Sequence, residues 1–233
     1  MLRTETYFRS LICLPIALFV LTASAQERSV SEGINERFTG AELNTTRSAS
    51  MFENENREVF SRRHDVLEAM NIEPGMAVAD VGAGSGFYVE IMAAAVGSEG
   101  QVYAVEIAPN WIDYLNEKIA AEGLDNVNVV QGGEQSIELP EASIDLAFSS
   151  DTYHHFEYPQ STLASIYEAL KPGGRWIVLD YDRIPGVTPA GRMNHLRLGK
   201  AEAIAETEAA GFELAEDLDL GLNENYLAIF RRP

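Results

Sequence analysis

The feature that most constrains this chain is an apolar run followed closely by three glycines, "AVADVGAGSGFYVEIMA" at residues 77–93. The apolar run predicts a buried strand, and Phe87–Val96 predict a helix. Between them lie Gly82, Gly84 and Gly86, where a missing Cβ lets backbone amides approach a ligand and permits positive φ. A strand, a glycine turn and a helix in this order indicate a ligand site at the carboxyl end of a strand.

Strand and helix patterns alternate along the rest of the chain. Further strands are predicted over 101–106, 126–130, 143–150, 175–180, 212–220 and 226–232, and further helices over 54–70, 111–122, 160–170 and 196–210. Repeated βα units imply a parallel sheet with helices on both faces. The last two strands are close enough in sequence to pair as an antiparallel hairpin. The predicted fold is therefore α/β, a doubly wound Rossmann-like sheet of seven mostly parallel strands with a C-terminal antiparallel β-hairpin.

The beginning of the chain predicts a secretory signal peptide over residues 1–25. Arg3 and Arg9 precede an apolar run at 11–21, and Ala23–Ala25 follow this run as an A-x-A cleavage site. The run is short for a transmembrane helix, although an uncleaved anchor is an alternative. Cleavage predicts an exported, periplasmic protein without stable membrane insertion.

Two further features concern the organisation of the exported chain. Residues 26–53 are polar and lack a helical or strand period, so they predict a flexible linker before a single domain at 54–233. Met51 is an in-frame alternative start that would leave the protein in the cytoplasm. Cys13 is the only cysteine, so the mature chain would have no thiolate nucleophile, disulfide or cysteine metal ligand.

The spacing of the glycines distinguishes between nucleotide cofactors. The dinucleotide motif is G-x-G-x-x-G, whereas here the third glycine comes one residue early and Phe87 takes its place. The pattern D-x-G-x-G-x-G, Asp80–Gly86, resembles motif I of class I S-adenosylmethionine-dependent methyltransferases. "SIDLAFSS" at 143–150 and "LKPGGRWIVLD" at 170–180 look like the fourth strand and the start of the fifth strand in that family. The resemblance covers about residues 57–231 and implies S-adenosyl-L-methionine as the cofactor.

The resemblance implies a role for each matching residue of the cofactor site. Asp80 would lie near the methionine amino group, and Glu106 would hold the ribose hydroxyls. Gly82 and Gly84 would pass under the methionine and ribose, and Ile107 would pack on the adenine. The predicted cofactor-binding residues are Asp80, Gly82, Ala83, Gly84, Gly86, Glu106, Ile107, Gly133, Glu134 and Ser149.

One position departs from the pattern of that family. Gly133 stands where an aspartate often meets the adenine amino group. Either the following residue, Glu134, or a backbone carbonyl takes over this contact. The predicted contact with the adenine therefore has less support than the contact with the ribose.

The loop after the fourth strand, "SSDTYHHFEYP" at 149–159, faces the transferred methyl group in that family. Its candidate catalytic residues are Asp151, Tyr153, His154 and His155. An imidazole that is half-titrated near neutral pH can take a proton from an acceptor, although only a protonated acceptor needs a base. The alternative is that one histidine orients the loop and the other is solvated.

Substrate-binding candidates follow the fifth strand. Tyr181 ends that strand, and His195 and Arg197 come from the next segment, where basic side chains suit an anionic acceptor. The alternative is a helix start with solvated basic residues. A metal site is not predicted, because the adjacent His154 and His155 are expected to point apart and no H-x-H or H-x-x-x-H spacing occurs.

The charge of the chain limits its partners. A net charge of −19 repels phosphates, so we expect no nucleic-acid partner. The sequence thus predicts an S-adenosylmethionine-dependent methyltransferase that acts on a small molecule, which the sequence does not name. Two alternatives stay open: a non-catalytic S-adenosylmethionine- or nucleoside-binding protein of the same fold, and an NAD-linked oxidoreductase, which the early third glycine disfavours.

Overall fold

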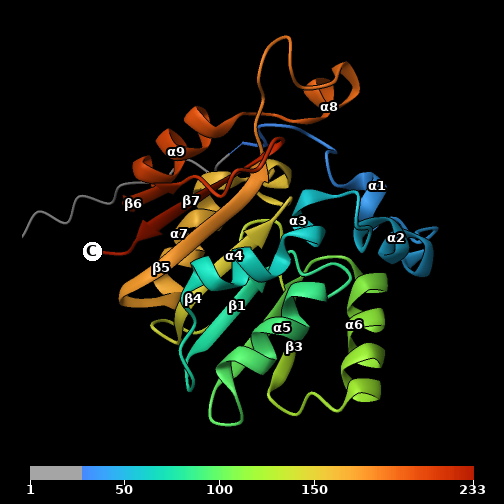
Figure 1. Cartoon of the computed structure of the whole chain (residues 1–233), viewed down its shortest axis with the longest axis vertical. Helices are drawn as coiled ribbons and strands as arrows, with labels where there is room; N and C mark the ends of the chain where they lie inside the picture. The colour runs from blue at the N-terminus through green and yellow to red at the C-terminus, as the bar shows by residue number, and fades with distance from the viewer. Residues whose placement is uncertain (1–27) are drawn as a thin grey trace, which may run out of the picture.

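A seven-stranded sheet forms the centre of the molecule, in the order β3-β2-β1-β4-β5-β7-β6 (Figure 1). The computed structural model describes residues 28–233, so the predicted signal peptide lies outside the described residues. The strands are β1 (Ala77–Val81), β2 (Gln101–Glu106), β3 (Val127–Gln131), β4 (Ile144–Ser150), β5 (Leu170–Tyr181), β6 (Glu213–Leu218) and β7 (Asn225–Arg231). Pairs among β1 to β5 are parallel, whereas β7 runs antiparallel to both β5 and β6. The predicted fold class is confirmed.

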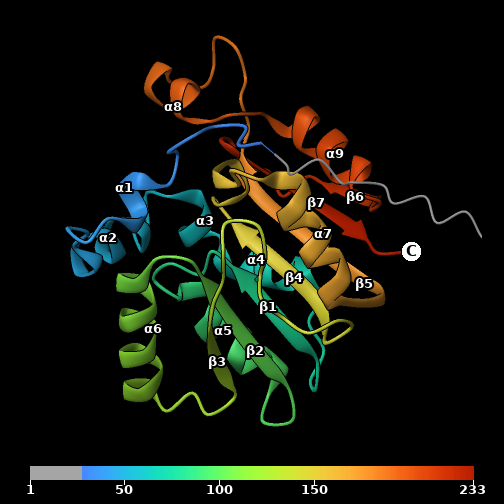
Figure 2. The same ribbon diagram turned by 180° about the vertical axis from the view of Figure 1, so that it is seen from behind.

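Helices cover both faces of this sheet (Figures 1 and 2). They are α1 (Glu36–Thr39), α2 (Thr45–Phe52), α3 (Glu58–Ser61), α4 (Arg63–Met70), α5 (Phe87–Val96), α6 (Pro109–Glu122), the 3-10 helix η1 (Tyr153–His155), α7 (Pro159–Ala169), α8 (Ala190–His195) and α9 (Lys200–Ala209). The apolar side chains of α4, α5 and α6 pack on one face, and those of α7 and α9 on the other. Successive strand residues such as Val78 and Ala79 enter opposite layers, which explains the nearly continuous apolar strands.

The strand order reverses between β1 and β4. After β1 the chain builds β2 and β3 on one side, and it then returns to place β4 on the other side of β1. In an open α/β sheet, a ligand binds beyond the carboxyl ends of the strands at such a reversal. The predicted residues Asp80, Glu106 and Tyr181 lie at the carboxyl ends of β1, β2 and β5, so the topology brings them to one edge.

The segment before the sheet is not the flexible linker predicted over 26–53. Its described part, residues 28–53, contains α1 and α2, and Ala49 is buried against Ala108 and Trp111. The Asn110 side chain of α6 also donates hydrogen bonds of 3.2–3.5 Å to three backbone carbonyls of this segment. Because few apolar residues make these contacts, the sequence of this segment shows no hydrophobic periodicity from which its helices could be predicted. The segment is part of the domain.

Several element boundaries also differ from the prediction. The helix predicted over 54–70 is divided at Arg62 into α3 and α4. The helix predicted over 196–210 begins only at Lys200, because the Gly199 N–H is capped by the Glu202 side chain at 3.2 Å. Ahead of it lies α8, which the sequence pattern did not predict. β5 begins before the expected turn, with Gly173 at φ +78° inside it.

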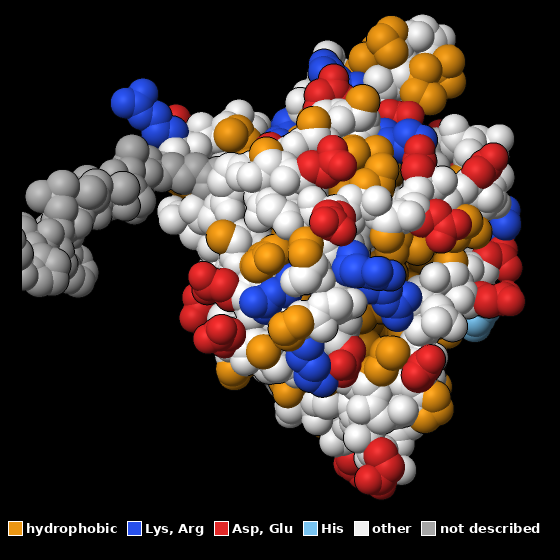
Figure 3. Space-filling view, turned by 90° about the vertical axis from the view of Figure 1, so that its left-hand side faces the viewer, with side chains coloured by type: hydrophobic (Ala, Val, Ile, Leu, Met, Phe, Trp, Pro, Cys, Tyr) orange, Lys and Arg blue, Asp and Glu red, His pale blue; other side chains and the backbone are white. Residues whose placement is uncertain are grey.

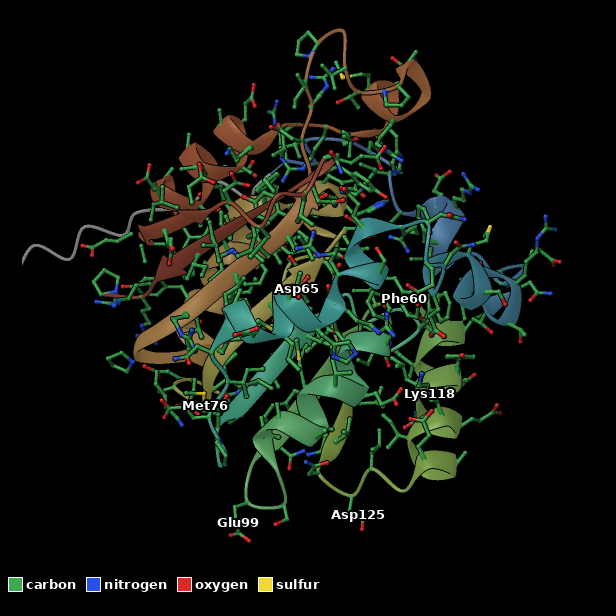
Figure 4. All side chains as sticks on the ribbon, viewed as in Figure 1. Phe60, Asp65, Met76, Glu99, Lys118 and Asp125 are labelled. Atoms are coloured by element: carbon green, nitrogen blue, oxygen red, sulfur yellow. The ribbon has the colours of Figure 1, made fainter. Side chains whose placement is uncertain are left out.

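Several contacts join the helices that surround the carboxyl ends of the parallel strands. Lys118 of α6 lies 3.7 Å from a carboxylate oxygen of Glu90 on α5 and 3.9 Å from one of Glu53 after α2. Such partly exposed pairs each contribute at most about 1 kcal/mol. The ring of Phe60 on α3, which is labelled in Figure 4, packs edge-on against Phe87 on α5, with centroids 5.3 Å apart. The helices around this edge are thus joined mainly by packing.

The surface carries the acidic excess of the chain. Figure 3 shows Asp and Glu side chains around one face, with Lys and Arg side chains gathered near its middle. Within residues 28–233, no helix has both the length and the apolar character that a bilayer span requires.

Candidate active site

A cavity of about 290 Å³ opens at the carboxyl ends of the central strands. Many of the predicted site residues share this cavity as lining residues. They are Asp80, Gly82, Ala83, Gly84, Glu106, Ile107, Gly133, Glu134, Asp151, His154, His155, Tyr181 and His195. The fold therefore brings the predicted cofactor residues and most of the predicted reaction residues into one space.

The glycine turn after β1 is tight at both ends and open in the middle. Gly82, Gly84 and Gly86 have φ values of +79°, +51° and +75°, a region that L side chains rarely adopt. A Cβ on Gly82 would lie 2.2 Å from Thr152 Cγ2, and one on Gly86 would lie 2.7 Å from Leu115 Cδ2. At Gly84 the nearest atom would be 3.7 Å away, so this residue borders open space.

These contacts correct the prediction for Gly86. The residue does not line the cavity, because its bare backbone faces α6 and not a ligand. It allows a helix to pack closely on the turn, as the last glycine of a dinucleotide motif does. Gly82 plays the matching part for the loop after β4, and Gly84 leaves room for a ligand.

Glu106 is bound to the glycine turn. One carboxylate oxygen accepts a hydrogen bond from Gly84 N–H at 2.9 Å, and the other accepts from Ile107 and Ala108 N–H at 2.8 and 3.0 Å. Burial raises the pKa of Glu106, and the three N–H donors partly oppose this shift. The carboxylate is therefore oriented by backbone N–H groups, and Glu106 is one of the residues that line the cavity.

Asp80 is the more unusual of the two acids. It is buried at the end of β1, and burial together with the charge of Glu106 raises its pKa to about 8. No basic side chain or hydrogen bond of the described residues offsets this shift. A cationic group in the cavity would favour the ionised carboxylate. The cofactor implied by the motif carries an ammonium and a sulfonium, so Asp80, Glu106 and the open turn at Gly84 fit it.

The predicted adenine end lies between β2 and the loop after β3. Ile107, Gly133 and Glu134 all line the cavity there. The Glu134 side chain is exposed, and its backbone carbonyl accepts a hydrogen bond from the Thr162 hydroxyl at 3.1 Å. A Cβ on Gly133 would have no neighbour nearer than 3.9 Å. The glycine at position 133 therefore leaves open space in the cavity wall at this end.

Asp151, a predicted catalytic residue, is held on both sides of its carboxylate. Its oxygen atoms lie 2.5 Å from an Arg57 Nη atom and 2.7 Å from Asn225 Nδ2. Burial raises the pKa of Asp151 to about 6 although Arg57 lowers it. Its backbone has φ +49°, which is uncommon outside glycine. The residue is suited to holding the loop in place.

The two adjacent histidines have opposite electrostatic surroundings. His154 is buried, and its Nδ1 lies 2.7 Å from an Asp180 oxygen while its backbone N–H donates to the other oxygen at 2.9 Å. Burial lowers the pKa of His154, but Asp180 more than reverses this and the pKa is raised. Burial, His154 and His195 lower the pKa of His155 to about 2. His154 is therefore the better placed to carry a proton near neutral pH.

A third histidine joins this pair. The His195 ring centroid lies 5.1 Å from that of His154 and 4.9 Å from that of His155, and the adjacent rings are only 4.3 Å apart. The expectation that His154 and His155 point apart is wrong. They lie on the tight turn η1, and Phe38 packs edge-on against His155 at 4.7 Å, which closes the outer side of the pair.

Besides Gly86, three further predicted residues do not line the cavity. Tyr153 is fully buried and its hydroxyl donates to Glu206 at 2.7 Å. Arg197 binds the same carboxylate through both terminal nitrogens, at 3.0 and 2.7 Å, so it is a structural ion pair and not a substrate ligand. Ser149 is fully buried inside the sheet, and the next residue of β4, Ser150, lines the cavity instead.

Sequence reasoning missed the contribution of the N-terminal segment. The cavity is also lined by Asn35, Phe38, Thr39 and Phe52 of this segment and by Arg57, which follows it. Asn35 Nδ2 donates to the backbone carbonyl of His155 at 3.1 Å, which ties this segment to η1. One local signal was available: Asn44 accepts a hydrogen bond from Arg47 N–H at 2.9 Å and caps α2, as an asparagine before a helix often does.

Comparison with known proteins agrees with this geometry. Residues 79–178 match a family model described as a methyltransferase domain. A demethylmenaquinone methyltransferase of Geobacillus kaustophilus is 29% identical over 118 residues, which cover 51% of this chain and 50% of that protein. The chain thus spans about half the length of the curated relatives it matches. This similarity supports a methyltransferase.

Solved structures show the same fold. A SAM-dependent methyltransferase from Aquifex aeolicus has a TM-score of 0.73 at 24% identity, covering 82% of this chain and 100% of that one. Phosphoethanolamine N-methyltransferase 2 of Haemonchus contortus, solved in complex with S-adenosyl-L-methionine, has a TM-score of 0.69 at 15% identity, covering 87% of this chain and 60% of that one. At these identities the likeness is one of fold.

Proposed function

We propose that this protein is an S-adenosylmethionine-dependent methyltransferase that acts on a small molecule. The observation that carries the proposal is the pair of buried acids, Asp80 and Glu106, on either side of the open turn at Gly84. The match of residues 79–178 to a methyltransferase domain supports it. A dinucleotide would require a different glycine spacing.

Each element of the cofactor side has a task in this proposal. S-adenosylmethionine, when bound, supplies an electrophilic methyl group on a sulfonium. Asp80 provides the negative charge that a cationic group needs, and Glu106 offers oriented oxygen atoms to the ribose hydroxyls. Ile107 provides an apolar wall for the adenine. Positioning supplies most of the catalytic effect in a transfer of this kind.

On the acceptor side of the cavity, the imidazole of His154 has a fixed orientation, and much of the surrounding cavity wall is apolar. Asp180 fixes the orientation of His154 at 2.7 Å, so His154 can accept a proton from the acceptor when the acceptor carries one. Aromatic residues, including Phe38, Tyr88 and Tyr181, form much of the surrounding wall. An aromatic or otherwise apolar small molecule fits this wall, and a demethylated quinone, which the name of the Geobacillus relative contains, is a first acceptor to test.

The cover over the cavity favours a small acceptor. Asn35 and Phe38 come from the N-terminal segment and contact His155. Such a cover excludes water from the reacting groups. It also leaves little room for a folded protein or a nucleic acid.

Export to the periplasm is part of this proposal. It is supported by the sequence of residues 1–25, in which an apolar run and an A-x-A site follow two arginines, as expected of a signal peptide. A chain that began at Met51 would lack Asn35 and Phe38, which line the cavity, and Ala49, which is buried. Expression with a C-terminal tag, followed by fractionation and N-terminal sequencing, tests this. A cytoplasmic product that begins at Met51 would contradict it.

Calorimetry with S-adenosylmethionine and S-adenosylhomocysteine tests the cofactor directly. We expect the folded protein to bind both, and Glu106→Ala to weaken both at least about tenfold, since it removes a hydrogen-bonded acid. Glu90→Ala is the control, because this exposed glutamate lies on α5 and outside the cavity. A folded sample that binds neither compound would contradict the proposal.

Two further measurements separate the remaining function classes. Denaturing extraction of the purified protein, with mass analysis of any released ligand, reports which nucleotide it carries. Production of S-adenosylhomocysteine with a panel of small acceptors distinguishes an enzyme from a binding protein. Binding of NADH in place of S-adenosylmethionine would favour the oxidoreductase.

A further inference from the structure

Three histidines from two separate segments meet at the wall of the cavity. His154 and His155 come from η1 and His195 ends α8, 40 residues later in the chain. One ring nitrogen from each lies within 4.8 Å of the others. Tetrahedral coordination at about 2.1 Å would place such nitrogens about 3.4 Å apart, so side-chain shifts of about 1 Å would bring all three onto one ion.

The surroundings of His154 match those of a metal ligand. Its Nδ1 is bound to Asp180, which leaves Nε2 as the free ring nitrogen. A carboxylate in this position fixes the ring and raises the basicity of the ligating nitrogen in many metal sites. Asp180 is buried and forms no salt bridge with Lys or Arg within the described chain, so its charge is available to balance a cation.

His155 and His195 add two independent observations. His155 Nδ1 is buried and has no hydrogen-bond partner in the described part of the chain, although buried polar atoms are normally paired. His195 is exposed at the end of the short helix α8, so its ring has the freedom to close on an ion. No other group of three metal-binding side chains occurs within residues 28–233.

We propose that His154, His155 and His195 form a binding site for a divalent transition-metal ion of the zinc class. All three line the cavity that also contains Asp80 and Glu106. Three imidazoles leave one coordination position for water or a ligand atom, as in catalytic zinc sites. Because all three histidines line the cavity, that position would face it.

A role of the ion in the reaction rests on the proposed function. An acceptor oxygen or sulfur atom bound at the open position would lose its proton to solvent more readily, since the metal lowers the pKa of a bound group. His154 would then be a ligand and not a base, because its free nitrogen cannot do both. The acceptor class that such a site favours is a hydroxyl or thiol compound.

Metal titration of the untagged protein tests the site without any cofactor. After treatment with a chelator and its removal, we expect one Zn²⁺ per chain by calorimetry. Co²⁺ should give the intense visible absorption of a four-coordinate site. His195→Ala should weaken Zn²⁺ at least about tenfold, and Asp180→Asn should weaken it about tenfold as the loss of an orienting partner. His64→Ala is the control, since His64 is exposed on α4.

The exposed position of His195 makes its variant the decisive one. Circular dichroism confirms that each variant is folded before titration. The inference is overturned when folded wild-type protein binds no stoichiometric metal, or when His195→Ala binds it as tightly as His64→Ala does. Calorimetry with S-adenosylmethionine on the same samples separates the two proposals, because metal binding without cofactor binding contradicts only the methyltransferase.

Discussion

The two halves of the cavity are assembled in different ways. The cofactor half, with Asp80 and Glu106, comes from the ends of two adjacent parallel strands that follow each other in the chain. The histidine half, with His154, His155 and His195, depends on contacts between residues that are far apart in the sequence. Asn35 binds His155, 120 residues away, and Arg57 binds Asp151, 94 residues away. Local turn geometry is enough for the first half, whereas the second exists only when remote segments have packed.

The largest effect should follow from a substitution where the two halves touch. In Gly82→Val, the new Cβ would start 2.2 Å from Thr152 in the histidine half, at φ +79°. Positive φ costs about 1–2 kcal/mol and overpacking costs about 1–3 kcal/mol. We expect a loss of about 4 kcal/mol in the free energy of unfolding, measured with urea, or failure to fold.

Gly84→Ala is the comparison for that result. Gly84 has φ +51° but no atom within 3.7 Å of the added Cβ, so only the backbone cost of about 1–2 kcal/mol applies. Equal losses in both variants would show that Thr152 can move away and that the halves are loosely joined.

The same difference explains what the sequence could predict. The strand ends and the glycine turn carry their signal within about 30 residues, so β1, α5 and β2 and both acids were predicted in place. η1 and its two histidines lie in the predicted loop, but the meeting with His195 depends on α8, which has no hydrophobic period. Tyr153 and Arg197 carry suitable chemistry and point to Glu206 instead, a contact that sequence spacing does not reveal.

Removing Arg57 should affect the histidine half more than the cofactor half. Arg57→Ala leaves the buried Asp151 without its cation, which costs about 3–5 kcal/mol in a fully buried pair and less here, because the Arg57 side chain is 24% exposed. The pKa of Asp151, already raised to about 6 by burial, should rise further. We expect lower stability in urea and less than about a threefold change in affinity for S-adenosylmethionine.

Arg47→Ala removes the same charge from an exposed position on α2 and controls for net charge. A large loss of cofactor affinity in Arg57→Ala, absent in Arg47→Ala, would show that the two halves are energetically coupled.

The pH dependence of stability tests the cofactor half. The pKa of Asp80 is about 8 in the folded protein and about 4 in an unfolded chain, so the folded state binds this proton more tightly. The stabilisation that comes from this more tightly bound proton is fully present below about pH 4 and is lost as the pH rises towards 8. Asp80→Asn should therefore gain more than about 1 kcal/mol over the wild type between pH 6 and pH 9.

Thermal unfolding across this pH range measures the effect. Asp125→Asn is the control, because Asp125 (labelled in Figure 4) is exposed and does not line the cavity. The same Asp80 variant should bind S-adenosylmethionine at least about tenfold more weakly, because it lacks the negative charge. Parallel stability curves for wild type and Asp80→Asn would mean that Asp80 is ionised in the folded protein without a bound cation.

The smallest effect should follow from removing the tie between the N-terminal segment and η1. Asn35→Ala removes one hydrogen bond of 3.1 Å to the His155 carbonyl, worth about 1 kcal/mol. Because α1 and α2 contact the rest of the domain through few residues, chiefly of α6, we expect faster amide exchange in residues 28–53 and unchanged exchange in α5. Asn116→Ala removes an exposed hydrogen bond within α6 and should leave residues 28–53 unchanged. A uniform increase in exchange throughout the chain would mean that residues 28–53 unfold only together with the sheet. The histidine half would then be as stable as the cofactor half.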